Sequence, residues 1–199
     1  MLGSFRVEMI PEDPYSFKTV CTIRFLERRV NESMRQNNSP YEQLIKGAVA
    51  GLVATVPMTI FMRSAWRMLP RREKYPLPPR LITRRLTKET GIDPKLDADQ
   101  LTWLTLTLHF LFGAAAGSLY GVIEPRVPLD GTVKGSLMGL AVWSGSYLGW
   151  IPAFHILPPA TEHPWRRNVL MIVAHLVWGI ALGLATRIMN ARRSYIHLS

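Results

Sequence analysis

The sequence predicts an all-α, polytopic membrane protein, a four-helix transmembrane bundle built from two tandem two-helix repeats, with short interfacial helices. Apolar residues gather in four blocks that are nearly free of charge, whereas most of the 24 Lys and Arg lie between the blocks. A soluble protein would instead mix the two kinds of residue along amphipathic elements. Two sequence patterns also recur in the same order in both halves of the chain, which predicts the tandem repeat.

The composition of the 199-residue chain argues against several classes of protein. Its net charge of +10 comes with no zinc-ligand set, aromatic RNA-binding signature or basic recognition helix, so no nucleic acid is expected. Anionic lipid headgroups are the predicted partner of the positive charge. Cys21 is the only cysteine, which excludes a disulfide within the chain and a cysteine-based zinc site. The spacing of His155, Glu162 and His163 matches no standard metal site, and no metal is predicted.

The first two elements are a polar and basic N-terminal arm, 1–43, and a membrane span at about 44–62. The arm carries charges throughout and has no sustained apolar core, so it does not read as a signal peptide. The span is long enough for the roughly 30 Å of a hydrocarbon core at 1.5 Å per residue. Pro57 lies inside it, where a neighbouring hydroxyl group or helix can satisfy the freed carbonyl.

The segment 63–100 is a basic, proline-rich loop. Its prolines at 76, 78 and 79 are expected to prevent regular structure before Arg80. Residues 81–90 then predict a short interfacial helix that ends at Gly91. Basic residues on this helix are placed to meet lipid phosphates, with a plain solvated loop helix as the alternative. They are Arg80, Arg84, Arg85 and Lys88.

Three further spans complete a membrane domain over 44–191, which is followed by a basic tail, 192–199. Four tryptophans fall at span ends on one side of the membrane, as in the aromatic belts of membrane proteins. Lys and Arg divide equally between the two faces of this topology, so the positive-inside rule does not decide the orientation. The further spans are predicted at about 101–123, 132–151 and 168–189.

The two halves share one pattern on each of their helices. Lys46-Gly-Ala-Val-Ala-Gly-Leu in the first span matches Lys134-Gly-Ser-Leu-Met-Gly-Leu in the third. The pattern His-x-x-aromatic-Gly-x-x-x-Gly begins at His109 in the second span and at His175 in the fourth. Halves of this kind are related by a pseudo-twofold axis along the membrane normal, and Gly-x-x-x-Gly lets helices approach closely. The glycines expected at helix contacts are Gly47, Gly51, Gly113, Gly117, Gly135, Gly139, Gly179 and Gly183.

His109 and His175 are expected at the same depth in the membrane, each at the head of a glycine stripe. An ionisable group there is costly unless it faces the bundle interior and finds a partner. Three interpretations stay open: packing histidines, axial ligands of a haem b, or the lining of a proton or solute path together with Tyr120 and Tyr147. We expect the two stripes to face each other or the bundle centre.

A set of proline and aromatic motifs extends over about residues 44–180. PLPPR lies at 76–80, His109-x-x-Phe falls within the second span, and Pro164-Trp-x-x-Asn is followed by His175-Leu-Val-Trp. This set resembles the YagU-like family of uncharacterised bacterial inner-membrane proteins. The resemblance implies a multi-pass protein of the bacterial inner membrane, and it supplies no catalytic residues.

The expected function is that of a non-enzymatic inner-membrane protein with a structural, interaction or membrane-homeostasis role. Such a protein would act through lipid and protein contacts, as a homo-oligomer or as a subunit of a membrane complex, without a resident cofactor. A small channel or transporter for protons or a small solute, with its path through the repeat interface, is the first alternative. A bis-histidine haem-binding redox protein is the second.

Overall fold

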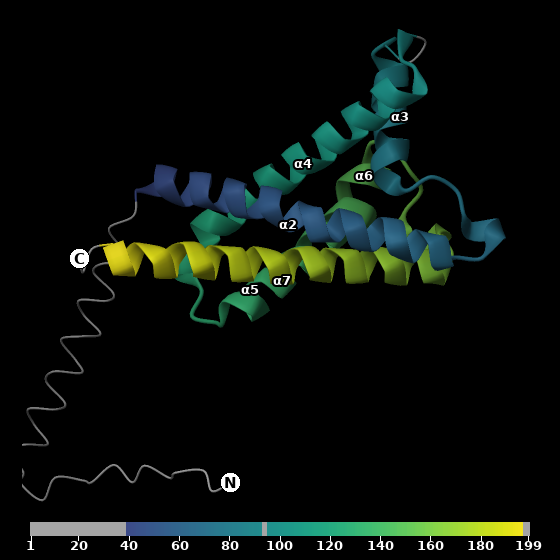
Figure 1. Cartoon of the computed structure of the whole chain (residues 1–199). Coiled ribbons are helices and arrows are strands. Elements are labelled where there is room, and N and C mark those ends of the chain that lie inside the picture. The colour runs from purple at the N-terminus through teal and green to yellow at the C-terminus, as the bar shows by residue number, and fades with distance from the viewer. Residues whose placement is uncertain (1–38, 93–94, 197–199) are drawn as a thin grey trace, which may run out of the picture. The chain divides into compact units, whose positions relative to one another are not determined.

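A computed structural model of the chain describes residues 39–92 and 95–196. The predictions for the N-terminal arm up to residue 38 and for the end of the tail, 197–199, lie outside the described residues. Every regular element among the described residues is a helix (Figure 1), which confirms the all-α class. The elements are α2 (Pro40–Met68), η1 (Arg71–Glu73), α3 (Pro78–Glu89), α4 (Ala98–Ile123), η3 (Glu124–Arg126), α5 (Gly131–Ser144), η4 (Gly145–Trp150), α6 (Ile151–Ala153), η5 (Ala160–Glu162) and α7 (Trp165–Ile196).

Three helices, α2, α4 and α7, are long and apolar enough to cross a membrane, with mean hydropathies of 1.8, 1.5 and 2.1 in their most apolar windows. They contain three of the predicted spans and extend beyond them, because polar residues continue each helix past its apolar part. In α4 a capping box fixes the start: Asp97 Oδ1 accepts from the backbone N–H of Gln100 at 2.7 Å, and Gln100 Oε1 accepts from that of Asp97 at 3.0 Å. These helices indicate a membrane protein.

The third predicted span, 132–151, is not one continuous α-helix. The helix α5 gives way to a π-helical segment, η4, and then to the single turn α6, so this part of the described chain holds no helix of spanning length. The break has a local cause. Gly149 has φ −107° and ψ −107°, and Pro152 lacks the N–H that would bond to the carbonyl of Leu148. Membrane helices tolerate both residues, so hydropathy alone does not reveal the break.

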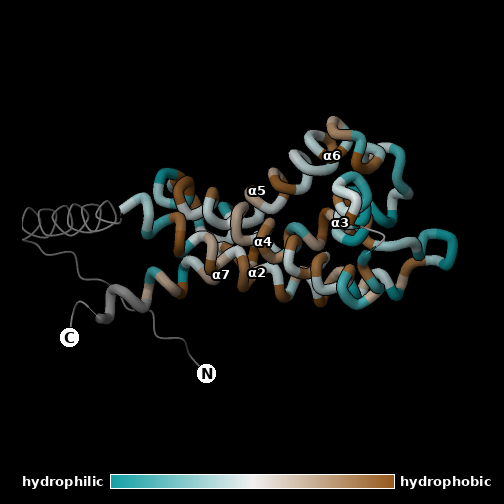
Figure 2. The backbone as a smooth tube through the Cα atoms, turned by 90° about the horizontal axis from the view of Figure 1, so that it is seen from above, coloured by the Kyte–Doolittle hydropathy of each residue, from teal (hydrophilic) through white to brown (hydrophobic). Residues whose placement is uncertain are grey.

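The long elements pack in the order α4, α2, α7, α5, since α2 contacts both α4 and α7, and α7 contacts α5. Figure 1 shows α2 and α7 side by side, with α3 near the start of α4. Figure 2 shows hydrophobic residues along α2, α4 and α7 and hydrophilic ones at α3. Large apolar side chains face outward, as expected where lipid is the solvent. Examples are Val53, Ile60, Leu111, Leu119, Leu137, Leu148, Ile180 and Ile188.

The predicted basic helix in the loop 63–100 is α3. It begins at Pro78, three residues earlier than expected, because proline in the first turn of a helix loses no hydrogen bond. It ends before Gly91, whose φ of +71° is a conformation that glycine adopts without strain.

The backbones of α2 and α4, and those of α5 and α7, come close together at glycine residues. A Cβ atom added to Gly117 would lie 2.7 Å from Cα of Gly51, and one added to Gly179 would lie 2.8 Å from the carbonyl carbon of Gly135. Real Cβ atoms essentially never come so close to backbone atoms. Approaches too short for a Cβ atom occur at Gly47, Gly51, Gly113, Gly117, Gly135, Gly139, Gly179 and Gly183.

The two glycine stripes do not face each other, which was one of the two expected arrangements. Gly113 and Gly117 of α4 approach α2, whereas Gly179 and Gly183 of α7 approach α5. Each stripe therefore packs against the preceding long helix of its own half. The contact between the halves is made mainly by α2 and α7.

The two helix pairs also differ in register. Under the sequence repeat, Gly47 corresponds to Gly135 and Gly117 corresponds to Gly183. A Cβ atom on Gly47 would overlap the carbonyl oxygen of Gly117, but one on Gly135 would overlap that of Gly179. Gly179 lies four residues, about one helical turn, before Gly183. The backbone contact in the second pair is therefore displaced by one turn toward the N-terminus of α7, where a Cβ atom on Gly139 would overlap the carbonyl oxygen of His175.

Candidate functional site

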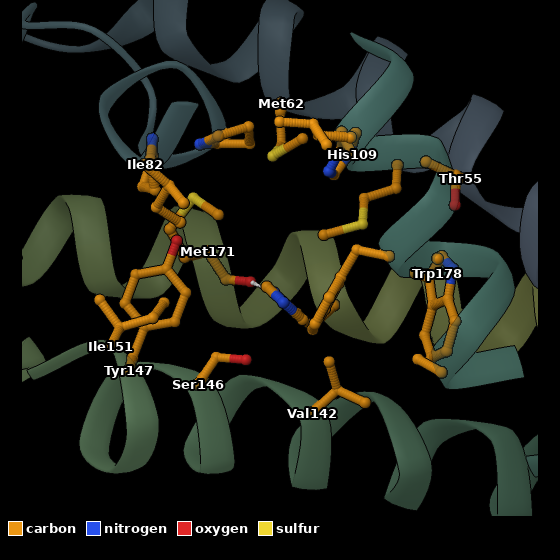
Figure 3. A pocket seen from close by; sticks show the side chains of 18 of the residues that line it. Thr55, Met62, Ile82, His109, Val142, Ser146, Tyr147, Ile151, Met171 and Trp178 are labelled. Atoms are coloured by element: carbon orange, nitrogen blue, oxygen red, sulfur yellow. Dashed lines mark hydrogen bonds between the residues drawn. The ribbon is translucent and has the colours of Figure 1, made fainter. Parts of the chain in front are cut away.

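A cavity of about 260 Å³ lies among α2, α3, α4, η4 and α7 (Figure 3). Gly113, the first glycine of the α4 stripe, stands at its edge, and His109 and His175 both line it. Most of the lining side chains are apolar or aromatic, and the described residues that form the wall include no Lys, Arg, Asp or Glu. A wall of this kind favours an uncharged occupant.

His109 brings an imidazole to the cavity from α4. Its Nε2 atom is buried and has no hydrogen-bond partner among the described residues. Such an atom is rare in folded proteins, because it has lost its water without a replacement. His109 and Met62 both line the cavity (Figure 3). Nε2 of His109 is thus a point to which a ligand or a water molecule can bond.

His175 lies on α7 and is 6% exposed. Its Nδ1 atom is 2.7 Å from the carbonyl oxygen of Met171, the bond marked by the dashed line in Figure 3. A carbonyl oxygen only accepts, so Nδ1 carries the hydrogen and Nε2 of the neutral ring carries a lone pair. The ring of Tyr147 meets the imidazole edge-on, with the centroids 6.1 Å apart. The orientation of His175 is therefore fixed from two sides.

The π-helical segment η4 supplies one wall of the cavity with Ser146, Tyr147 and Trp150. A π turn holds more residues than an α turn and so changes which side chains face inward, and such turns are frequent at functional sites. Trp150 donates from Nε1 to the hydroxyl of Ser146 at 3.3 Å, and its ring lies 6.2 Å from that of Phe112 on α4. The break in the third predicted span is thus part of the site.

Trp178 closes the cavity on the side of the glycine contacts. Its side chain is 2% exposed, and Nε1 donates to the carbonyl oxygen of Gly51 at 3.2 Å. The same oxygen accepts from the hydroxyl of Thr55 at 2.8 Å. In Figure 3 Trp178 lies on the opposite side of the pocket from Tyr147. Phe112 holds the matching position in the sequence pattern that begins at His109 and is 44% exposed, so the two copies of the pattern contribute unequally to the site.

The helix α3 covers the cavity with its apolar face and turns its basic face outward. Pro78, Ile82 and Leu86 line the cavity. Of the basic residues predicted to meet lipid, Arg84, Arg85 and Lys88 are exposed. Arg80 and Arg85 have partners within the chain: Arg80 donates to the hydroxyl of Thr102 at 3.2 Å, and Arg85 pairs with Glu89 at 2.8 Å.

Arg167, at the start of α7, holds the segment that leads into α3. Its side chain is buried, with 5% exposure, and it stacks on the ring of Tyr75 at 3.5 Å from the centroid. The guanidinium group donates to three backbone carbonyls, those of Glu73 at 2.8 Å, Tyr75 at 3.0 Å and Pro76 at 3.0 Å. These bonds place α3 over the cavity.

The sequence did not single out Arg167, because its neighbour Arg166 is the same amino acid. In the structure Arg166 is exposed and Arg167 is buried. The one available signal was the distinctive Pro164-Trp-x-x-Asn motif that surrounds it. Next to it, Nδ1 of His163 lies 3.1 Å from the hydroxyl of Tyr75. Burial lowers the pKa of His163, and the positive charge of Arg167 lowers it further.

Other residues that the sequence singled out lie away from the cavity. Tyr120 donates to the carbonyl oxygen of Gly131 at 3.3 Å, and Lys134 forms a salt bridge with Glu124 across the link between α4 and α5. Among the described residues, no three His, Cys, Asp or Glu side chains are grouped so that they could hold a metal ion.

Comparison with known proteins places the chain in a family. The family model DUF1440, described as a protein of unknown function, matches residues 62–184. This range includes α3, α4, η4 and most of α7, and with them both histidines and most of the cavity wall. No match was found among curated proteins or among solved structures. The narrower resemblance to the YagU-like proteins stays a prediction. The chain belongs to DUF1440, a family of proteins of unknown function.

Proposed function

We propose that this protein resides in the bacterial inner membrane, catalyses no reaction, and binds a small uncharged molecule in the cavity. The carrying observation is the cavity itself, an apolar space between long apolar helices, lined by one histidine from each half. Ligand sites typically combine such a wall with a few polar groups that fix orientation. Two imidazoles that line the cavity and have nitrogen atoms left to bond meet that description better than a solid packing core does.

The proposal also includes a topology in which the chain crosses the membrane four times, in two tandem pairs of crossings. The elements α5, η4 and α6 follow one another without a gap and form the remaining crossing as a broken span. Backbone groups freed at a break are tolerated where protein or a cavity covers them, and η4 lines the cavity. The glycine approaches in both pairs support an internal duplication.

The basic face of α3 supports a contact with anionic lipid headgroups in this proposal. Arg84 and Lys88 are exposed beside the membrane-crossing helices, where lysine and arginine meet the phosphates of the interface. Association with a second copy, or with other subunits of a membrane complex, would use the outward apolar faces of the helices.

A cavity-filling substitution tests the proposed function. In lipid nanodiscs, n-propylbenzene should shift the methyl NMR signals of Met58, Met62 and Met171, which line the cavity. The signal of Met68, which is 86% exposed, reports on general partition into the lipid. Val142 of α5 also lines the cavity. Val142→Trp should weaken binding by at least about tenfold, because the larger ring fills the space.

Leu137→Trp on the same element is the matched control, since Leu137 is 53% exposed and does not line the cavity. It should leave binding as in the unchanged protein. Shifts that appear only at Met68, or equally at all four methionines, would show that the probe enters the lipid and not the cavity, and would refute the proposal.

Transport is the second candidate, and the presence of a cavity lined by His109, His175 and Tyr147 favours it over a solid interface. If the cavity belongs to a path, the protein in liposomes should carry protons or a small solute. His109→Ala and His175→Ala should each abolish that flux, because the path loses a polar group on which it depends. Flux that is absent, or unchanged in both variants, would eliminate this candidate.

Haem ligation by His109 and His175 stays a prediction. The cavity of about 260 Å³ lies below the usual range of roughly 300–1,000 Å³ for sites that take drug-sized ligands, and haem is larger than most such ligands. An absorption spectrum of protein expressed with a haem supply decides it: a Soret band would support a haem site, and its absence would remove one.

A further inference from the structure

We infer that the ligand of the cavity carries a hydroxyl group on an apolar body and that this group donates its hydrogen to Nε2 of His175. The inference rests on the proposed function and adds the chemical class of the ligand. It covers alcohols, phenols and other neutral molecules with one O–H group. Carboxylates, phosphates and amines in their charged forms are excluded.

The first step is the tautomer of His175. Its Nδ1 hydrogen is committed to the carbonyl oxygen of Met171, so Nε2 offers a lone pair and no hydrogen. Within the described part of the chain, no side chain or backbone group donates to this Nε2. A ligand that contacts the atom favourably must therefore bring the donor.

The second step is that most donors of the wall are already used. The hydroxyl groups of Thr55, Thr83 and Thr105 each donate to a carbonyl of their own helix, at 2.8, 2.8 and 2.7 Å. The indoles of Trp150 and Trp178 donate to Ser146 and to Gly51. The wall thus presents a vacant acceptor at His175, which an O–H group complements.

The third step concerns charge. The described residues that line the cavity include no ionic side chain, so a charged ligand would lose its hydration without gaining a counter-charge. A hydroxyl group avoids this cost and also has an oxygen that accepts. Nε2 of His109, which has no partner, can supply a hydrogen to such an oxygen when it is the protonated nitrogen of its ring.

The fourth step concerns the apolar body. Met58, Met62 and Met171 contribute flexible thioether side chains to the wall, and such side chains adapt to ligand shape and contact aromatic rings favourably. With Tyr147 and Trp178 on opposite sides (Figure 3), the cavity suits a single aromatic ring with a short chain. A simple alkylphenol is therefore a fitting probe.

The test compares 4-propylphenol with 4-propylanisole, which has a methoxy group in place of the hydroxyl group. Binding in nanodiscs is measured from the methionine methyl signals, for the unchanged protein and for His175→Phe. For each protein, the affinity for the phenol is divided by the affinity for the anisole. This ratio should be about tenfold higher for the unchanged protein than for His175→Phe, because the variant keeps a ring but has no acceptor. Comparing the two ratios cancels any difference in partition into the lipid.

A second measurement uses the unchanged protein alone. In protein with ¹⁵N-labelled histidine, the Nε2 signal of His175 should have the shift of an unprotonated nitrogen, move when the phenol is added, and stay in place with the anisole. Equal binding of both probes, or a protonated Nε2, would overturn the hydroxyl inference and leave the proposed function standing. Absence of any cavity-specific methionine shift with either probe would count against the proposed function itself.

Discussion

Gly117→Ala should destabilise the folded protein by about 3 kcal/mol, although alanine is normally the better helix former by about 1 kcal/mol. The new methyl group would meet the carbonyl oxygen of Gly47 and lie 2.7 Å from Cα of Gly51. Both neighbours are backbone, so no side-chain rotation relieves the overlap and the helices must separate. The free energy of unfolding in bicelles, measured by steric trapping, checks this.

Gly145→Ala is the control, because it should not lower the free energy of unfolding. Gly145 has helical angles, φ −60° and ψ −32°, and nothing lies within 4 Å of the position its Cβ would take. The substitution should be neutral or should stabilise the protein by up to about 1 kcal/mol. If both substitutions change the free energy of unfolding alike, backbone contact at Gly117 is not what holds α2 to α4.

Arg167→Met should destabilise the protein by about 3–5 kcal/mol and loosen α3 from the cavity. The substitution keeps most of the side-chain volume but removes the guanidinium donor from the carbonyls of Glu73, Tyr75 and Pro76. The carbonyl of Tyr75 keeps the indole N–H of Trp66 at 3.1 Å, but each lost hydrogen bond to a charged group contributes about 1.5–3 kcal/mol. Arg167→Lys should recover only part of the loss, since a single ammonium group does not reproduce the guanidinium fork.

The neighbouring substitution Arg166→Met is the matched control. The Arg166 side chain is 49% exposed, and its contact with Glu73 is 3.4 Å long, so the loss should stay below about 1 kcal/mol. Hydrogen exchange of the α3 amides adds a local readout: Arg167→Met should speed it and Arg166→Met should not. Equal effects of the two substitutions would show that the loop is not held by Arg167.

The sequence was sufficient to locate α2, α4 and α7, because a run of about twenty apolar residues is a strong and local signal. It was insufficient for the third predicted span, where Gly149 and Pro152 change the backbone without changing the hydropathy. The short basic helix α3 and its end before Gly91 were predictable, but its start was not, because Pro78 and Pro79 lie in its first turn. Its position over the cavity was not, since that depends on Arg167, far away in the sequence.

The cavity, too, was only partly predictable from the sequence. Matched positions in a repeat predicted that His109 and His175 lie at similar depth, and both line one cavity. The repeat did not predict that the glycine contacts of the second pair are displaced by a turn, because register depends on backbone contacts that no sequence pattern encodes. Nor did it predict that Nδ1 of His175 donates to its own helix, which decides the chemistry its ring offers.

The way in which Arg167 holds the loop bears on how the family's sequences can diverge. All three of its acceptors are backbone carbonyls, which every amino acid possesses. Residues 73 and 76 are therefore free to change identity without losing the bond, whereas position 167 has no substitute. Among relatives that keep this architecture, we expect variation to accumulate in the loop and arginine to persist at the start of α7. A comparison of homologous sequences would show whether residues 73 and 76 vary more than position 167.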